Sequence, residues 1–231
     1  MSRDHVIDVH THTFHSDGSL SPMELVRRAV VNGYSAIGIT DHVGLGGVAD
    51  LLALLHRERD IIERYWPIQV FVGVELTHVP AEAIADAATF ARNSGAELVV
   101  VHGETPVEPV PPGTNHASIV CGFVDVLAHP GLLTLEDARL AAEGDVFLEI
   151  TARKGHSLTN GHVLRVAQAS GARLIVNSDS HDPGDLLTPA FQERVARGAG
   201  MTDAEIHAAL ETNPVQLIRR LMERRDASTS R

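Results

Sequence analysis

The sequence lacks several features that mark particular classes of protein. Its 231 residues include one cysteine, Cys121, which excludes a disulfide framework and a zinc module built on cysteines. No apolar run approaches the roughly 18 residues that cross a bilayer. The start, MSRDHVIDVHTHT, has no apolar core of a secretory signal. These absences predict a cytoplasmic protein that does not contact membranes.

Positive charge is also scarce. Lys and Arg number 19 against 30 Asp and Glu, for a net charge of −11, and Lys154 is the only lysine. General nucleic-acid binders and proteins of anionic membranes carry a basic surface, so this composition disfavours both classes. The composition gives no indication of the oligomeric state.

Short apolar runs alternate with longer helical patterns along the chain. The runs are nearly continuous in Val, Ile and Leu, as in strands covered on both faces, and the alternation predicts an α/β fold with a parallel sheet. A closed or nearly closed barrel fits better than an open sheet, although periodicity alone does not decide between them. No linker is visible, so we predict one domain over residues 1–231, with a frayed tail at 225–231. The predicted strands are Val6–His12, Ala36–Thr40, Gln69–Leu76, Leu98–His102, Val124–Ala128, Val146–Ile150 and Leu174–Asn177.

Helix starts are marked by capping sequences. Ser21–Glu24 forms a capping box with proline at the first helical position, and Thr134–Asp137 and Thr202–Glu205 are similar. Asn213 and Pro214 open a last helix.

Histidine is abundant, and many of the 14 histidines follow predicted strands. In a parallel barrel all strands end on one face, where active sites are built. Six of the seven predicted strands place a histidine or carboxylate there, which is hard to explain as six unrelated polar residues. The set comprises His10, His12, His42, Glu75, His102, His129, Asp179 and His181, with Asp17 in the loop after the first strand.

The size and composition of this set indicate metal chemistry. Six histidines and three carboxylates exceed the ligands of one catalytic metal, but they suit two or three divalent ions with a bridging carboxylate. Imidazole and carboxylate ligands without thiolate suit zinc, manganese or iron. Such a cluster activates water and offsets oxyanion charge, so a small phosphorylated molecule is the expected substrate.

The ordered motifs resemble those of the PHP (polymerase and histidinol phosphatase) family. The match runs from residue 8 to about 181 and includes the helix start at Asn213. The motifs are His10-x-His12, Ser16-Asp17-Gly18, Thr40-Asp41-His42, Gly73-x-Glu75, His102, His129-Pro130 and Ser178-Asp179-Ser180-His181. The resemblance implies a distorted seven-stranded (β/α)7 TIM-like barrel with a multinuclear metal site.

The resemblance also implies how the ligands divide. One metal would be held by His10, His12, Glu75 and Asp179, and Glu75 would bridge to a second held by His102 and His129. A third would be held by Asp17, His42 and His181. His15 could compete with Asp17, and if Asp17 points away the site would be binuclear.

The activity implied is that of a metal-dependent phosphoesterase, a phosphatase in which a metal-bridging hydroxide attacks a phosphomonoester. Glu75, Asp179 and His181 would act in catalysis as ligands of the metals. Separately, the loop after the sixth strand is cationic although that strand supplies no ligand. There, Arg153 and Lys154 are candidates to bind the phosphate, and His156 could protonate the leaving oxygen.

Three alternatives stay open. An amidohydrolase-type C–N hydrolase also begins with HxH, but it usually needs a bridging lysine after the fourth strand, where this chain has His102. A non-catalytic PHP module would bind metal without turnover. A diesterase acting on oligonucleotides is disfavoured by the acidic balance.

Other polar residues have weaker assignments. Asp8 and Asp41 could orient metal-bound imidazoles or could simply stabilise strand ends. The Pro-rich loop Gly103–Asn115 could form a substrate wall through Glu104, Thr114 and Asn115. The histidines expected to lie outside the site are His5, His56, His78, His116, His162 and His207.

Overall fold

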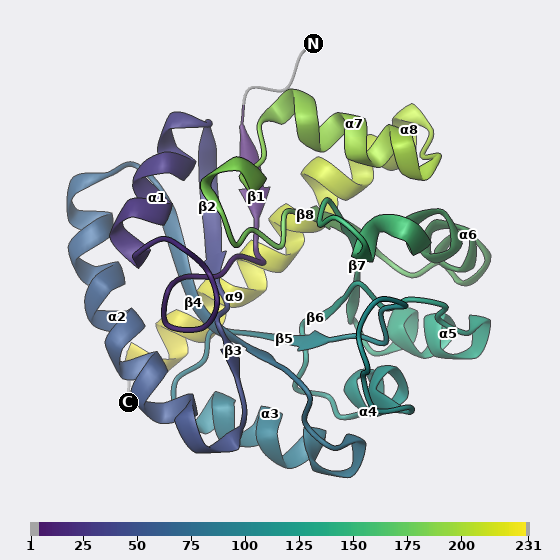
Figure 1. Cartoon of the computed structure of the whole chain (residues 1–231), viewed down its shortest axis with the longest axis horizontal. Helices are drawn as coiled ribbons and strands as arrows, with labels where there is room; N and C mark the ends of the chain where they lie inside the picture. The colour runs from purple at the N-terminus through teal and green to yellow at the C-terminus, as the bar shows by residue number, and fades with distance from the viewer. Residues whose placement is uncertain (1–4, 230–231) are drawn as a thin grey trace.

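The computed structural model describes residues 5–229, and its parallel strands form a nearly closed barrel surrounded by helices (Figure 1). The strands are β1 (Val6–Asp8), β2 (Tyr34–Ile39), β3 (His42–Val43), β4 (Gln69–Leu76), β5 (Leu98–His102), β6 (Val126–Ala128), β7 (Phe147–Thr151) and β8 (Leu174–Asn177). Seven of these strands pair in the order β1-β2-β4-β5-β6-β7-β8, and the two-residue strand β3 pairs with β4. The predicted α/β barrel of seven parallel strands is confirmed.

Two details differ from the prediction. The first strand ends at Asp8, and beyond it Thr11 makes an isolated parallel bridge to Ser180 that nearly closes the barrel. The short strand β3 was not predicted, because two residues are too few to show a period. It pairs His42 with Glu75, so this extra strand brings two predicted ligands side by side.

The three predicted helix starts are observed, although of these three only Thr202–Glu205 forms a complete capping box. Ser21 and Thr134 accept hydrogen bonds from the backbone N–H of Glu24 and Asp137, and Thr202 forms a capping box with Glu205. The helices are α1 (Pro22–Val31), α2 (Val48–Tyr65), α3 (Ile84–Asn93), α4 (Thr114–Val120), α5 (Leu135–Glu143), α6 (Asn160–Ser170), α7 (Pro189–Ala199), α8 (Asp203–His207) and α9 (Asn213–Thr229). Across residues 5–229, no helix is long and apolar enough to cross a membrane.

Glycines allow close packing where two of the ligand-bearing strands end. Gly103 directly follows His102, and a Cβ there would lie 2.3 Å from the backbone oxygen of Ala128. Gly131 has φ 65°, and a Cβ there would lie 1.8 Å from the backbone oxygen of Glu104. The ends of β5 and β6 can therefore approach closely only because side chains are absent at these points.

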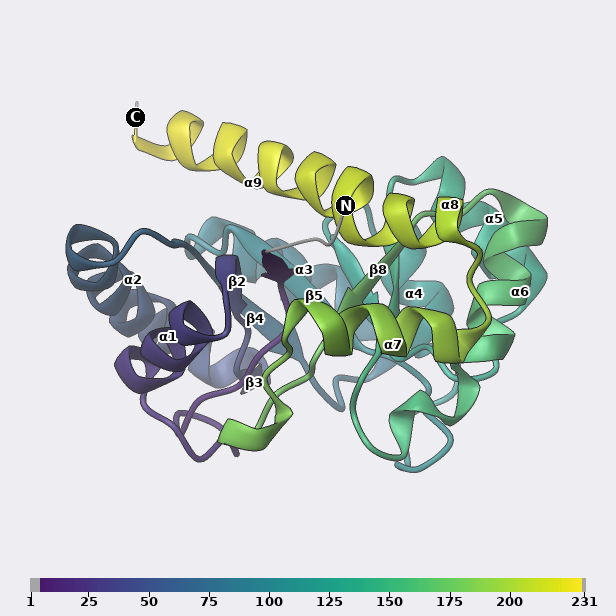
Figure 2. The same cartoon turned by 90° about the horizontal axis from the view of Figure 1, so that it is seen from above.

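The core has two parts, one between the strands and the outer helices and one inside the barrel. In the second part, Leu217, Ile218 and Leu221 of α9 pack with inward side chains such as Phe71 and Phe147. Figure 2 shows α9 lying across one end of the barrel. Because this helix covers the amino-terminal ends of the strands, the carboxyl ends remain available for a site.

Ion pairs hold α9 against the barrel. Asp125, at the start of the β6 segment, is fully buried and pairs with Arg92, Arg220 and Arg224. Arg225 pairs with Glu97 at 2.8 Å and with Glu63 at 3.3 Å. The frayed tail was expected to start at residue 225, but α9 continues to Thr229, and Arg225 is held by these pairs; residues 230 and 231 lie outside the described chain.

We expect Asp125→Ala to lower the free energy of unfolding by about 2–3 kcal/mol, because it removes a buried acceptor that several guanidinium groups share. Urea unfolding followed by circular dichroism measures this loss. Glu193→Ala is the control, because Glu193 pairs with Arg197 on an exposed helix face, and it should cost less. Equal losses in the two variants would show that Asp125 does not anchor α9.

Candidate metal centre

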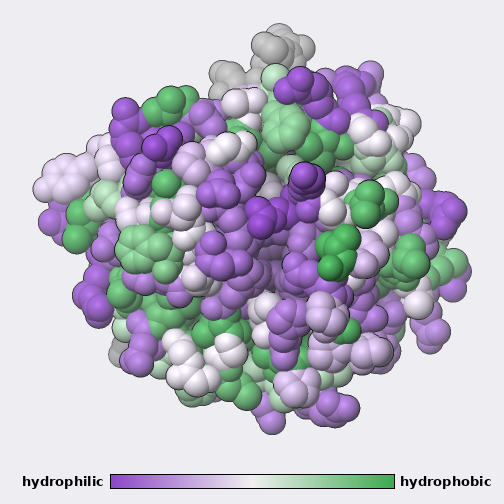
Figure 3. All heavy atoms as spheres, viewed as in Figure 1, coloured by the Kyte–Doolittle hydropathy of each residue, from purple (hydrophilic) through white to green (hydrophobic). Residues whose placement is uncertain are grey.

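The predicted ligands meet at the carboxyl ends of the strands, in a cavity of about 440 Å³. Figure 3 shows hydrophilic side chains gathered in a hollow at the centre of this face. The cavity wall includes the predicted ligands Asp17, His42, His102, Asp179 and His181. Residues from both halves of the sequence therefore share one site.

Glu75, near the end of β4, is the centre of the cluster and is completely buried. Its two carboxylate oxygens face five imidazoles that come from four other segments of the chain. Oε2 faces His42 Nδ1 (2.8 Å), His10 Nε2 (3.2 Å) and His12 Nε2 (3.4 Å), and Oε1 faces His102 Nδ1 (3.3 Å) and His129 Nε2 (3.6 Å). This position between two groups of imidazoles fits a carboxylate that bridges metals.

Asp179, which follows β8, is the second buried carboxylate of the cluster. Its Oδ1 lies 3.2 Å from His12 Nε2 and 3.8 Å from His10 Nε2, and its Oδ2 lies 3.6 Å from His129 Nε2. Asp179 has φ 53° and His129 has φ 27°, in a region that residues other than glycine rarely adopt. Strained backbone of this kind clusters at functional sites.

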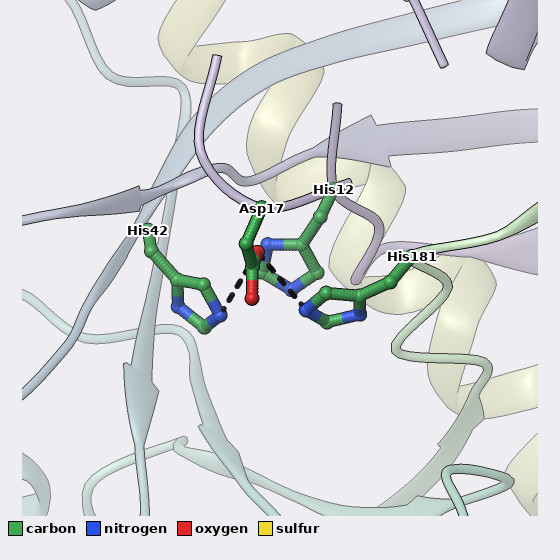
Figure 4. Close-up of side chains that lie close together, drawn as sticks. All are labelled: His12, Asp17, His42 and His181. Atoms are coloured by element: carbon green, nitrogen blue, oxygen red, sulfur yellow. Dashed lines mark ion pairs between the residues drawn. The ribbon is translucent and has the colours of Figure 1, made fainter. Parts of the chain in front are cut away.

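A third group lies at the rim (Figure 4). Asp17 Oδ1 lies 3.1 Å from His181 Nε2 and 3.6 Å from His42 Nε2, and His12 is close enough to share an ion with them. The Asp17 side chain points into the group, as a third site requires. The ring of His15, the alternative to Asp17, lies against Phe14 at 4.5 Å between ring centroids.

The donor atoms fit divalent ions. Among residues 5–229, eleven buried side-chain nitrogen and oxygen atoms lack a hydrogen-bond partner; eight of them belong to predicted ligands and one to the neighbouring Glu149. Leaving so many polar atoms unsatisfied is costly unless another group binds them. Several sets of ligand atoms lie within 4.8 Å of one another and could each hold an ion, and three of these sets consist of predicted ligands alone: His10, His12 and Asp179; His42, Glu75 and His102; and His12, Asp17, His42 and His181.

The pKa shifts of the buried side chains also fit a site that binds cations. Burial opposes ionisation of Glu75, but the imidazoles of His10 and His42 hold the pKa of its carboxyl well below the usual range. Burial also opposes protonation of His42, but the nearby carboxylate of Glu75 raises the pKa of His42 to about 9. Without metal, protonated imidazoles of His10 and His42 therefore offset the charge of Glu75, and bound cations would replace those protons.

Asp8 and Asp41 have supporting roles that do not involve imidazole nitrogens. Asp8 Oδ1 accepts a hydrogen bond from the backbone N–H of His10, and Oδ2 accepts one from the Tyr34 hydroxyl. Asp41 accepts hydrogen bonds from Thr13 and from the Ser16 hydroxyl, so it holds the loop that carries Asp17. Both residues therefore hold backbone segments in place, which agrees with the expectation that they stabilise strand ends and not with a role in orienting imidazoles.

The loop after β7 contains the three candidates for substrate contact. Arg153 lines the cavity, and its Nη1 lies 3.2 Å from Asp185 Oδ2. Lys154 is exposed and does not line this cavity. His156 is buried, its Nδ1 lies 2.7 Å from Thr105 Oγ1, and its ring stacks on His129. Burial and the neighbouring His129 lower the pKa of His156 to about 4.

The Pro-rich loop contributes a residue that the sequence did not single out. Glu104 and Asn115 hydrogen-bond to each other, and Thr114 and Asn115 begin α4, so these residues close the loop on itself. Glu108 instead reaches the cavity, where its Oε2 lies 3.0 Å from His102 Nε2. Only its position in a loop after a ligand strand could have indicated this.

Two more residues near the site escaped prediction. His78, expected outside the site, lines the cavity and has φ 52°. Glu149 of β7 is completely buried, and its Oε2 lies 2.7 Å from His10 Nδ1. The signal for Glu149 was a carboxylate inside the apolar run Phe147–Thr151. The sixth predicted strand, assigned no ligand, therefore still contributes to the cluster.

Comparisons with known proteins agree with the motifs. The PHP domain model matches residues 8–108. The uncharacterized protein MJ1295 of Methanocaldococcus jannaschii is 45% identical over 93% of this chain and 99% of its own. Probable phosphatase Teth514_1060 of Thermoanaerobacter sp. (strain X514) is 25% identical over 86% of this chain and 88% of its own.

Solved structures show the same fold at low sequence identity. The crystal structure of A. niger ochratoxinase superposes with a TM-score of 0.58 at 12% identity, covering 92% of this chain and 71% of its own. This likeness concerns the barrel alone. The domain match, the close relative along nearly the full length and the ordered ligand set lead to one conclusion: the chain belongs to the PHP domain family.

Proposed function

We propose that this protein is a phosphatase that hydrolyses phosphomonoesters of small molecules. Its family is one of metal-dependent phosphoesterases, and a relative of similar length is named a probable phosphatase. The observation that carries the narrower proposal is the cavity itself, in which five of the nine candidate ligands and Arg153 line the same open space. A phosphate group in this space would reach both the metal ions held by the ligands and the guanidinium group of Arg153.

Two or three divalent ions, of zinc, manganese or iron, would be held by the nine predicted ligands. When bound, such ions supply a water-derived nucleophile near neutral pH and offset the charge of phosphate oxygens. The chain's own contribution is to fix the ligands. Glu75 and Asp179 would hold the inner ions, and Asp17, His42 and His181 would hold the outer one.

Arg153 and His156 would orient the substrate. Arg153 can offer two parallel N–H donors to phosphate oxygens, and its present partner Asp185 keeps the side chain at the cavity. The Thr105 hydroxyl can donate to His156 Nδ1, which leaves an N–H at Nε2. That N–H would donate to the leaving oxygen or to a phosphate oxygen.

The amidohydrolase alternative gains no support from the residues at the strand ends. Where the bridging lysine would stand, His102 faces Glu75 Oε1 at 3.3 Å. Lys154, the only lysine, is exposed and outside the cavity. These positions favour the phosphoesterase.

We expect the purified protein to release inorganic phosphate from at least one member of a panel of phosphomonoesters, and chelation to abolish the release. The measurement is colorimetric phosphate detection with matched elemental analysis, and re-addition of Zn²⁺, Mn²⁺ or Fe²⁺ should restore activity. Bis(p-nitrophenyl) phosphate serves as the diester control. Bound metal without turnover of any monoester would indicate the non-catalytic module instead.

We expect Arg153→Ala to reduce kcat/KM for the best monoester roughly tenfold to a hundredfold, because hydrogen bonds between charged groups contribute about 1.5–3 kcal/mol. Steady-state kinetics on the metal-loaded protein provide the values. Lys154→Ala removes the neighbouring charge outside the cavity and should change kcat/KM much less. If the two variants behaved alike, Arg153 would have no specific role in binding phosphate.

A further inference from the structure

We propose that Glu149 is a positioning residue for the metal centre, which holds the His10 imidazole so that its Nε2 faces the metals. None of the predicted ligand sets includes Glu149, and the strand that carries it was assigned no role at the site. The inference concerns how the centre binds metal, so it does not depend on which phosphoester is hydrolysed.

Glu149 lies in the interior between three neighbouring strand segments. Its Oε2 lies 2.7 Å from His10 Nδ1 and accepts a hydrogen bond from Asn177 Nδ2 at 2.8 Å. Asn177 is itself fixed, because its Oδ1 accepts a hydrogen bond from the backbone N–H of Val9 at 3.1 Å. A continuous chain of hydrogen bonds thus links β7, β8 and the segment that carries His10.

The two nitrogens of His10 face different partners. Nδ1 is engaged by Glu149, whereas Nε2 lies 3.2 Å from Glu75 Oε2 and 3.8 Å from Asp179 Oδ1. A carboxylate that accepts a hydrogen bond from one ring nitrogen selects the tautomer with a lone pair on the other. Once a metal replaces the Nε2 proton of His10, the lone pair lies at Nε2, on the side of the two candidate ligand carboxylates.

The presence of a carboxylate at this buried position is difficult to explain by its effect on stability alone. Glu149 is completely buried, and its Oε1 is one of the buried atoms without a hydrogen-bond partner. Burying a half-satisfied carboxylate is costly, and an apolar side chain would fill the same strand position without that cost. A role in holding a metal ligand accounts for the residue.

The test is metal binding, measured with Zn²⁺ or Mn²⁺ alone by competition with a chromophoric chelator and by elemental analysis. Glu149→Gln keeps the shape and an oxygen acceptor but removes the charge, so we expect the dissociation constant to rise roughly tenfold. Glu149→Ala also frees the ring and should raise it further, up to about a hundredfold. Unchanged dissociation constants in both variants would overturn the proposal.

A double-mutant cycle with His10→Ala separates positioning from direct ligation. Because His10, His129 and Glu149 also lie close enough to share an ion, Glu149 could bind metal itself. If Glu149 acts through His10, adding Glu149→Gln to His10→Ala should cause no further loss of affinity. Independent losses that add in the double variant would contradict a positioning role.

Folding is checked by circular dichroism and thermal unfolding in excess chelator. Glu97→Gln is the matched control, because Glu97 is a buried carboxylate that pairs with Arg59 and Arg225 at the opposite end of the barrel. It should lower stability and leave metal affinity unchanged. If Glu149→Gln does not fold, Asn177→Ala weakens the same hydrogen-bond chain and should raise the dissociation constant in the same direction; unchanged affinity there would overturn the proposal.

Discussion

The site depends on how a completely buried carboxylate, Glu75, is surrounded by five imidazoles. A carboxylate in this position is stable only if cations or protons compensate its charge. The strands bring the imidazoles to it from separate parts of the chain, so the barrel has to be formed before the charge is balanced. Folding and cation binding are therefore linked through one side chain.

The two ends of the barrel handle charge in different ways. At the amino-terminal ends of the strands, Asp125 and Glu97 are neutralised by arginines, several of them from α9. At the carboxyl ends, imidazoles take the place of guanidinium groups. Arginine stays charged and cannot ligate metal, whereas a neutral imidazole can bind an ion. This difference explains why one end is a permanent structural contact and the other can exchange protons for metal.

The sequence was informative where chemistry coincides with a boundary of secondary structure. The candidate ligands His102 and His129 directly follow apolar runs, and Asp179 comes two residues after β8, so the end of each run located them. Glu149 lies within such a run, so no boundary marked it. Its direction into the barrel follows from the register of β7 with β8, which the sequence does not give. The positions of Glu108 and His78 at the cavity depend on the paths of loops, and a loop has no sequence periodicity from which its path could be predicted. The two-residue strand β3 was too short to predict, although it sets His42 beside Glu75.

The gap between the first and last strands is closed mainly by residues of the candidate centre. Beyond the end of β1, the backbone N–H of Asp179 donates to the His10 carbonyl, and the N–H of His12 donates to the Ser180 carbonyl. The same two segments carry side chains that would share an ion. Ions bound there would act as cross-links between the beginning of the chain and a segment some 170 residues later. The barrel could then open along this line only by releasing its metals.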